Sequence, residues 1–278
     1  MRPLFTGPLT VEAVTVSVRD LPRRLEGCRI VQLSDFHFDG QRLSLGLLRQ
    51  VVDRVNDLAP DLVALTGDYV TSDPAPIFTL AAHLSQLKSR CGTVAVLGNH
   101  DNVTLGGRRT VLRSLQQVGI CTLWNDVAYP LGHDLPVVGL ADFWSRDFYP
   151  QLLDTLAPAQ PRLVLSHNPD SAEFLAPWRV DLQLSGHTHG GQIVLPGIGP
   201  VPALTQSLRL SVLARLPFDI PLPYLRRRCL KVVRHWEWVS GLHHVGQNQL
   251  YVNRGLGSYA PGRLGCPPEI TVVELVGV

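Results

Sequence analysis

The 278-residue sequence has no long uninterrupted hydrophobic run and no N-terminal segment with the composition of a secretory signal. No window is long and apolar enough to span a bilayer, and residues 1–16 lack a basic stretch followed by a long apolar one. Internal repeats and low-complexity segments are also missing, which excludes a solenoid architecture and a disordered chain. We therefore expect a globular protein located in the cytoplasm.

Cysteine is scarce, and its spacing excludes the common cysteine-based sites. The chain has five cysteines, an odd number, and no two of them have C-x-x-C spacing. Neither a disulfide scaffold nor a structural zinc knuckle is expected in a chain of this length and pattern. Free, mostly buried thiols are the expectation, and they favour a reducing compartment.

Charge of one sign is not in large excess, since the formal net charge is +2 and 17% of the residues are charged. No extended basic strip accompanies the motifs described below, so no nucleic-acid partner is expected. The sequence gives no sign of a protein partner either. Its 45% hydrophobic residues suffice for one large core, and we predict a single domain over residues 1–278.

The sequence does contain a regular alternation of short apolar runs and amphipathic stretches. Buried strands are predicted at 29–33, 62–66, 93–97, 136–140, 162–166 and 181–185, with closing strands at 249–253 and 269–276. Apolar residues at helical spacing predict helices at 43–58 and near 77–88, and 11–18 alternates like an edge strand. This pattern favours an α/β fold with much parallel pairing.

Residue types that bind metals follow five of these apolar runs directly. They are Asp35 and His37, Asp68, Asn99 to Asp101, His167 with Asn168, and His187 with His189. Sites in open α/β sheets form where loops leave the carboxyl ends of strands, so the five loops are expected to converge. One such residue after a strand is more often a turn or a cap, but five in one chain reverse that interpretation.

The chemistry of these side chains predicts a site for two metal ions. Imidazoles and carboxylates with one amide and no thiolate suit Mn, Fe, Zn or Ni better than Ca or Mg. The candidate ligands number seven, which exceeds one ion's usual share: Asp35, His37, Asp68, Asn99, His167, His187 and His189. Asp68 is the natural bridge, because a carboxylate offers two oxygens. Two ions about 3.5–4 Å apart can generate a hydroxide and hold a phosphoryl group for in-line displacement.

The sequence resembles the calcineurin-like metallophosphoesterases in the order of its motifs, which are D-x-H, G-D, G-N-H-D, a lone His and G-H-x-H. Two longer strings, GHTHGGQIVLPGIGP at 186–200 and RGLGSYAPGRLGCPPEI at 254–270, are similar to a bacterial branch. That branch includes phosphodiesterases and hydrolases of UDP-2,3-diacylglucosamine. The resemblance covers the chain from about residue 11 to the end, and it implies a two-sheet β-sandwich flanked by helices.

The resemblance also implies a role for each site residue. One metal would be held by Asp35, His37, Asp68 and His189. The other would be held by Asp68, Asn99, His167 and His187. A hydroxide bridging the two ions would attack phosphorus, and His100 would lie by the leaving group, where it donates a proton or stabilises charge. The glycines around the last two histidines would leave room for a phosphate.

Four further residues are candidates for substrate binding. Asn168 follows an expected ligand and is a candidate to hydrogen-bond the phosphate, whereas Asp142 follows a strand and either touches substrate or makes a turn. Arg254 and Arg263 are candidates because a planar guanidinium suits phosphate oxygens, although a surface position is the commoner fate of arginine.

The segment Gly67 to Asp73 departs from the GDYVDRG pattern of family members that dephosphorylate proteins. Thr71 stands where an acid would orient His100, and no arginine follows. Protein phosphatase activity is therefore disfavoured. The orienting partner of His100 stays open at this point, with Asp101 and Asp73 as candidates.

An apolar and basic insert is expected at about 206–235. Its seven basic residues against one aspartate give a net charge of +6. Such a composition favours an element that lies on anionic lipid at the inner face of the membrane, and a solvated charged lobe is an equal alternative.

The substrate predicted from the motifs and the insert is a phosphodiester or pyrophosphate with a lipid or nucleotide-sugar moiety. The alternative function is a catalytically silent, metal-stabilised scaffold that binds a partner through 206–235.

Overall fold

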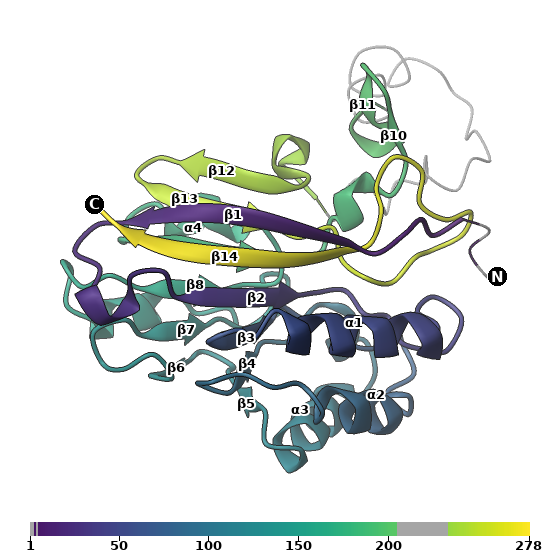
Figure 1. Ribbon diagram of the computed structural model, residues 1–278, viewed down its shortest axis with the longest axis horizontal. Coiled ribbons are helices and arrows are strands. Elements are labelled where there is room, and N and C mark those ends of the chain that lie inside the picture. The colour runs from purple at the N-terminus through teal and green to yellow at the C-terminus, as the bar shows by residue number, and fades with distance from the viewer. Residues whose placement is uncertain (1–2, 4, 205–232) are drawn as a thin grey trace.

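Two six-stranded sheets form the centre of the computed structural model, which describes residues 3, 5–204 and 233–278 (Figure 1). The first sheet contains, in spatial order, β1 (Thr10–Val18), β14 (Glu269–Gly277), β2 (Arg29–Leu33), β3 (Leu62–Leu65), β4 (Thr93–Ala95) and β5 (Cys121–Thr122). The second contains β12 (Gly241–Val245), β13 (Asn248–Val252), β9 (Leu182–Ser185), β8 (Leu163–Leu165), β7 (Val137–Gly139) and β6 (Asp126–Ala128). A separate hairpin pairs β10 (Val194–Leu195) with β11 (Gly199–Pro200).

Most neighbouring strands run parallel, which sets where the loops gather. The strands β2 to β5 are parallel to one another in the first sheet, and β7, β8, β9 and β13 are parallel in the second. β1 pairs in parallel with β14 along the edge of the first sheet, so the first and last described strands lie side by side, although the N and C marks lie on opposite sides of the molecule (Figure 1). In each sheet the carboxyl ends of the parallel strands therefore share one edge.

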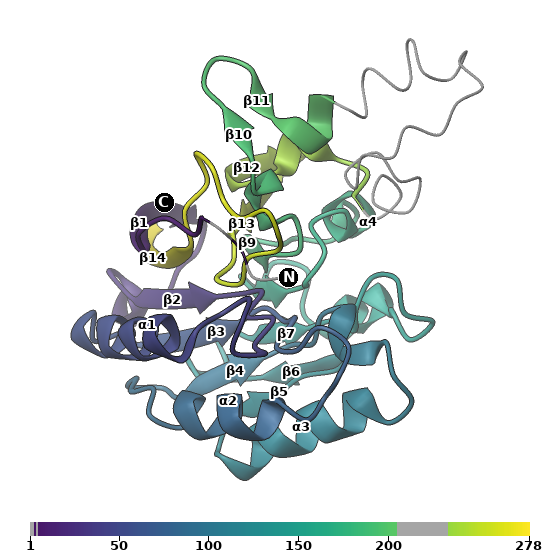
Figure 2. The same cartoon turned by 90° about the vertical axis from the view of Figure 1, so that its right-hand side faces the viewer.

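Helices cover the outer faces of both sheets. The helices α1 (Leu45–Asp57), α2 (Ile77–Leu84) and α3 (Gly107–Gln117) pack on the first sheet, and α4 (Ser171–Leu175) packs on the second with the 3-10 helix η3 (Pro150–Thr155) (Figure 2). α1 begins where the Ser44 hydroxyl accepts a hydrogen bond from the Leu47 amide at 3.2 Å, an N-cap that satisfies an otherwise free donor. Its apolar stripe is buried against the sheet at Leu48, Val51, Val52 and Val55.

Alternating side chains along the strands separate the layers of the core. In β3, Leu62 and Ala64 face the second sheet, whereas Val63 and Leu65 face the helices. β8 repeats the pattern, because Leu163 and Leu165 join the layer between the sheets while the residue between them faces outward. Strands buried on both faces explain the continuous apolar runs of the sequence. The predicted α/β fold, a two-sheet sandwich flanked by helices, is confirmed.

Sequence patterns located most elements and missed several short ones. The predicted edge strand at 11–18 is β1, and the predicted helix at 43–58 is α1. The short strands β5, β6, β10, β11 and β12 and the helices α3 and α4 were not predicted. Cys28, Cys91, Cys121 and Cys266 are free, and no described helix is long and apolar enough to cross a membrane. Most of the insert expected at 206–235 lies outside the described residues, and the single domain stays a prediction.

Core packing predicts that a substitution in a buried layer lowers the free energy of unfolding more than one at the surface. Leu65→Ala removes a fully buried side chain of the helix-facing layer and should lower the free energy of unfolding by about 2–5 kcal/mol. Leu105→Ala, at a fully exposed position, should change it by no more than about 0.5 kcal/mol. Urea unfolding of both variants measures the difference. Equal effects would contradict the assigned layers.

Candidate metal centre

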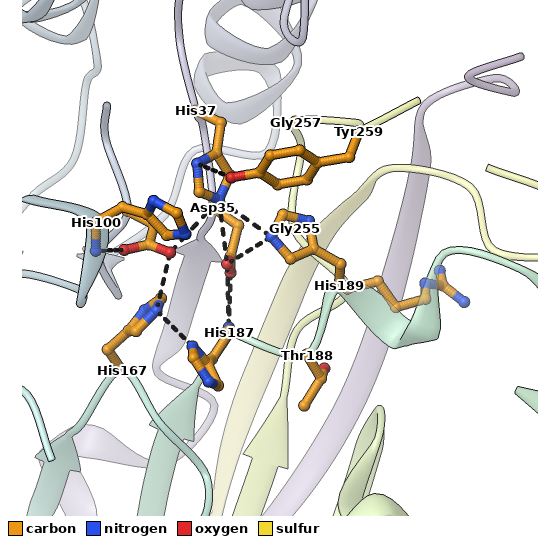
Figure 3. A network of polar contacts seen from close by, with 12 residues as sticks. Asp35, His37, His100, His167, His187, Thr188, His189, Gly255, Gly257 and Tyr259 are labelled. Carbon is orange, nitrogen blue, oxygen red and sulfur yellow. Dashed lines mark hydrogen bonds and ion pairs between the residues drawn. The ribbon is translucent and has the colours of Figure 1, made fainter. Parts of the chain in front are cut away.

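The five motif loops leave neighbouring strand ends of both sheets. β2, β3 and β4 supply three loops, and β8 and β9 of the opposite sheet supply the other two. Gln32 ties the sheets together directly behind the loops, because its Nε2 donates to the Thr66 hydroxyl at 2.9 Å and to the Ser185 carbonyl at 2.8 Å. The motif side chains converge in the space between the two sets of loops (Figure 3).

Five of the seven expected ligands have a left-handed backbone, which is rare outside glycine. The φ angles are 52° at Asp35, 42° at His37, 56° at Asp68, 73° at His187 and 52° at His189. Each such conformation costs roughly 1–3 kcal/mol and persists only where the surroundings impose it. This concentration of strain in one place is characteristic of a functional site.

A first cluster joins Asp35, His37 and His189. The ring nitrogens Nε2 of the two histidines face each other at 3.1 Å, and His189 Nε2 lies 3.3 Å from Asp35 Oδ1. The Asp35 carboxylate is held in place because it accepts the main-chain amide of His187 at 2.9 Å. All three side chains are buried or nearly so, and their ligand atoms lie within 4.8 Å of one another.

A second cluster joins Asp68, His167 and His187. His167 Nε2 lies 3.2 Å from Asp68 Oδ2 and 3.2 Å from His187 Nδ1. The other ring nitrogen of His167 donates to the Thr66 carbonyl at 2.7 Å, which leaves Nε2 as the nitrogen that faces the cluster. These three residues also form a compact group of potential metal ligands.

Asp68 connects the two clusters. Its Oδ2 lies 3.4 Å from His37 Nε2 on one side and 3.2 Å from His167 Nε2 on the other. Its Oδ1 accepts the main-chain amide of His100 at 2.9 Å. One carboxylate therefore faces imidazoles of both groups, the position that the bridging role requires.

Burial and the neighbouring charges set the protonation of these groups. Burial lowers the pKa of His37 well below its usual value and that of His189 to about 4, so both rings are neutral at neutral pH. Burial alone would raise the pKa of Asp68, but the surrounding histidines, His167 above all, hold it well below its usual value. Burial also opposes charge on His167, yet Asp68 outweighs it and raises that pKa to about 10. A cation bound here would displace the His167 proton.

The donor set fits divalent cations. The Oδ1 atom of Asn99 is buried and accepts no hydrogen bond from a described group, although a buried amide oxygen normally has a partner. Asn99 follows Gly98, where an added Cβ would lie only 2.1 Å from Asp68 Oδ1. Two neutral ring nitrogens facing each other, two carboxylates and an unpaired amide oxygen are the ligands that Mn, Fe and Zn accept.

His100 is oriented by a main-chain group and by neither candidate aspartate. Its Nδ1 donates to the Thr71 carbonyl at 2.6 Å, and its ring meets that of His37 edge to face at 4.9 Å between centroids. Asp101 instead accepts four main-chain amides, two on each oxygen, from the loops after β3 and β4. Asp73 accepts the amide of Ala75 in its own turn. Asp101 thus shapes the loops that carry Asp68 and His100.

The glycines of the GHTHGGQ block have a different use from the one expected. At two of these glycines, the missing side chain lets another residue of the chain approach the backbone closely. An added Cβ at Gly186 would lie 2.2 Å from Asp35 Oδ2, and one at Gly190 would lie 2.5 Å from Cys266 Sγ. The room for a phosphate stays a prediction, because the spacing of the glycines does not show which groups approach them.

The two polar candidates for substrate contact lie close to the second cluster. Asn168 is fully buried beside His167, and its Oδ1 accepts the Asp170 amide at 2.9 Å. Asp142 is 2% exposed, and its Oδ2 accepts the Trp144 amide while its Oδ1 accepts no hydrogen bond from a described group. Burial raises the pKa of Asp142 to about 6, against the opposing charge of His167.

Both arginine candidates form ion pairs or hydrogen bonds with other residues of the chain. Their expected role in binding phosphate therefore has no geometric support. The Arg254 guanidinium lies 2.7 Å from Glu269 and 2.5 Å from Glu12. Arg263 is 3% exposed and donates to the carbonyl oxygens of Arg254, Gly257, Cys266 and His189. Arg263 therefore fastens the loop after β13 to the loop that carries His189.

Tyr259 is a site residue that the sequence patterns did not single out. Its hydroxyl lies 3.1 Å from His37 Nδ1, and its ring meets those of His37 and His189 edge to face (Figure 3). The signal was present in the string RGLGSYAPG, but a tyrosine is not a common metal ligand, so no ligand pattern included it.

Comparison with known proteins gives a consistent set of relatives. The sequence profile described as calcineurin-like phosphoesterase matches residues 28–191. Phosphodiesterase YaeI of Escherichia coli is 33% identical over 259 residues, which cover 89% of this chain and 82% of that protein. The uncharacterized metallophosphoesterase YkuE of Bacillus subtilis is 31% identical over 98% of this chain and 87% of its own length. UDP-2,3-diacylglucosamine pyrophosphatase LpxG of Chlamydia muridarum is 30% identical over 91% and 86%, respectively.

The four amide contacts of Asp101 predict a loss of stability in Asp101→Asn. An amide has one acceptor oxygen, so the pair of main-chain donors facing its NH₂ group would lose their acceptor, at about 1–3 kcal/mol for each unsatisfied group. Urea unfolding measures the loss, with Asp73→Asn in an exposed turn as the control. If the two variants are equally stable, Asp101 does not hold the loops together.

Proposed function

This chain belongs to the calcineurin-like phosphoesterases and is a metal-dependent hydrolase of phosphoric esters or anhydrides, and on that basis we propose that it cleaves a phosphodiester or pyrophosphate with two divalent cations. The observation that carries the proposal is the Asp68 carboxylate, whose Oδ2 lies within 3.4 Å of imidazoles from two adjoining ligand clusters. When bound, a pair of cations supplies an activated water as nucleophile and neutralises charge on the phosphoryl oxygens. Mn, Fe and Zn are the proposed metals.

The proposed ligand roles follow the two clusters. Asp35, His37 and His189 hold one cation, and Asn99, His167 and His187 hold the other, with Asp68 shared between them. Their carboxylate, imidazole and amide groups fix the position of the phosphoryl group by fixing the two cations. The buried main-chain contacts of Asp35 and Asp68 keep these carboxylates in one orientation.

His100 is proposed as the residue that assists the leaving group. Its ring lies against that of His37 at the edge of the first cluster, and it is only half-buried, so it can reach a bound ester. The hydrogen bond from Nδ1 to the Thr71 carbonyl directs Nε2 away from that carbonyl. An imidazolium held in this way has its Nε2 proton free to transfer to a departing oxygen.

The substrate class is proposed from the relatives and from the chain's own charge. One relative is named a phosphodiesterase and another a pyrophosphatase of UDP-2,3-diacylglucosamine, a lipid-bearing nucleotide sugar. A substrate with an apolar moiety also suits the basic and apolar segment 206–235. The alternative of a catalytically silent scaffold has no support in these relatives or in the complete set of candidate ligands.

Substitutions at Asp68 and His100 should affect different steps. Asp68→Asn removes the charge shared by both clusters. It should abolish cation binding and, with it, hydrolysis of bis(p-nitrophenyl) phosphate. His100→Ala should lower kcat by about 10²–10⁴-fold and leave the bound metal in place. Steady-state kinetics and elemental analysis of the purified proteins measure the two effects.

The exposed residue His133 provides a matched control, because it lies outside every candidate ligand group of the described chain. His133→Ala should keep both the activity and the metal content of the original protein. Full activity in Asp68→Asn would contradict the proposed site, and loss of metal in His100→Ala would contradict the proposed role of His100.

A peripheral position on the inner face of the membrane is proposed from the composition of 206–235 alone. Serine substitution of Arg226, Arg227 and Arg228 should weaken binding to vesicles that contain phosphatidylserine, by about 1 kcal/mol for each charge near the surface. The matched control replaces three exposed helix arginines, Arg49, Arg109 and Arg113. Co-sedimentation at low salt measures both triple variants. Equal binding by the two would exclude the proposed lipid contact.

A further inference from the structure

Tyr259 stands next to the first ligand cluster without belonging to it. The centroid of its ring lies 5.0 Å from that of His37, 5.4 Å from that of His189 and 6.3 Å from that of His100. Its hydroxyl oxygen lies 3.1 Å from the Nδ1 atom of His37 (Figure 3). Thr71 Oγ1 is the other described group near this nitrogen, and it is more distant at 3.4 Å.

The two nitrogens of His37 face different surroundings. Nε2 faces His189 Nε2 at 3.1 Å and Asp68 Oδ2 at 3.4 Å, which are the atoms of the ligand clusters. Nδ1 faces the Tyr259 hydroxyl. A ring nitrogen binds a metal through its lone pair, so the proton of a neutral, metal-binding His37 must be on Nδ1. The phenol oxygen is placed to accept that proton in a hydrogen bond.

Tyr259 is itself firmly positioned. Its main-chain amide donates to Gln192 Oε1 at 2.7 Å, and the Arg42 guanidinium lies 5.0 Å from its ring centroid. Arg42 is in turn paired with Asp39. A side chain held by a polar contact at its backbone and a cation at its ring can direct a neighbouring imidazole.

The loop before Tyr259 lies directly on the loop that carries Asp35 and His37. The amide of Gly257 donates to the Asp35 carbonyl at 2.7 Å. An added Cβ at Gly257 would lie 2.6 Å from the Phe36 carbonyl oxygen, so only glycine permits this approach. The string GLGSY is therefore explained as the support of the D-x-H loop.

We propose that Tyr259 is a positioning residue for the first metal ion: its phenol oxygen accepts the Nδ1–H of His37 and thereby directs the Nε2 lone pair of His37 toward that ion. The inference rests on the proposed function, because it assigns Tyr259 a task at one of the two proposed metal positions.

The effect should be confined to the first ion. In the second cluster, the corresponding support of His167 comes from the Thr66 carbonyl at 2.7 Å, a main-chain group that no side-chain substitution removes. Tyr259 makes no described contact with His167 or His187. Loss of its hydroxyl should therefore weaken one metal position and spare the other.

Tyr259→Phe removes the hydroxyl and keeps the ring. It should weaken binding of the first ion about 10–100-fold, the usual effect of removing a partner that orients a ligand. Calorimetric titration of chelator-treated protein with Mn²⁺ measures the affinity in two backgrounds. In His187→Ala only the first position stays complete, and in His189→Ala only the second does. The loss should appear in the first background and not in the second.

Tyr251→Phe is the matched control. Its hydroxyl is also buried and hydrogen-bonded, to Glu269 at 2.7 Å, and Tyr251 belongs to none of the candidate ligand groups of the described residues. This variant should bind Mn²⁺ as tightly as the original protein in both backgrounds. Unchanged affinity in Tyr259→Phe, or an equal loss in both backgrounds, would overturn the inference. Failure of the unsubstituted protein to bind any Mn²⁺ or Zn²⁺ would instead overturn the proposed function.

A second measurement tests the inference without any change at Tyr259. In Zn²⁺-loaded protein with ¹⁵N-labelled histidine, the His37 ring should be the neutral form protonated at Nδ1. Assignment uses the resonances that disappear in His37→Gln. Protonation of His37 at Nε2 would overturn the inference even if Tyr259→Phe fails to fold.

Discussion

The structure depends on one buried carboxylate placed between two groups of imidazoles. Asp68 is 1% exposed, and the same oxygen faces His37 and His167 at 3.4 and 3.2 Å. Buried charges are costly unless they are paired or coordinate a metal. In the first cluster two imidazoles, both with a lowered pKa, face each other through their Nε2 atoms at 3.1 Å. Divalent cations, as proposed, would pair with the buried carboxylate and bind the facing nitrogens. In the proposed reaction, the charge of these cations would stabilise the negative charge that develops on a phosphoryl group attacked by water.

The fold places Asp68 between the two groups of imidazoles by bringing the ends of the two sheets together. Parallel strands deliver the ligand loops to a shared edge in each sheet, and Gln32 fixes the distance between the sheets behind them. The loops then adopt left-handed backbone at five of the proposed ligand positions. The cost of this strain is offset by hydrogen bonds that hold the loops. Asp101 accepts four main-chain amides, and the buried Arg263 guanidinium donates to carbonyl oxygens of two loops. The groups that hold the loops near the site thus lie outside the candidate ligand groups of the described residues.

Ordered motifs after apolar runs predicted that the candidate ligands converge, as the structure shows, whereas the residues that support them were not predicted. Residue type and order indicate metal chemistry for Asp35 or His187 because few other uses need those groups at successive strand ends. The same reasoning did not predict the intrachain partners of Arg254 and Arg263, since a guanidinium binds carbonyls and carboxylates as readily as phosphate. It left Tyr259 and the Thr71 carbonyl undetected, because contacts between distant loops have no local pattern. Short strands such as β5 escaped for a related reason: two residues show no periodicity.

Anomalous X-ray diffraction from crystals soaked in Mn²⁺ tests the central claim most directly. The account predicts two peaks per chain, about 3.5–4 Å apart, on either side of the Asp68 carboxylate. One peak should lie against His37 and His189 and the other against His167 and His187. A single peak, or peaks bound away from Asp68, would contradict the two-cation centre on which the proposed chemistry depends.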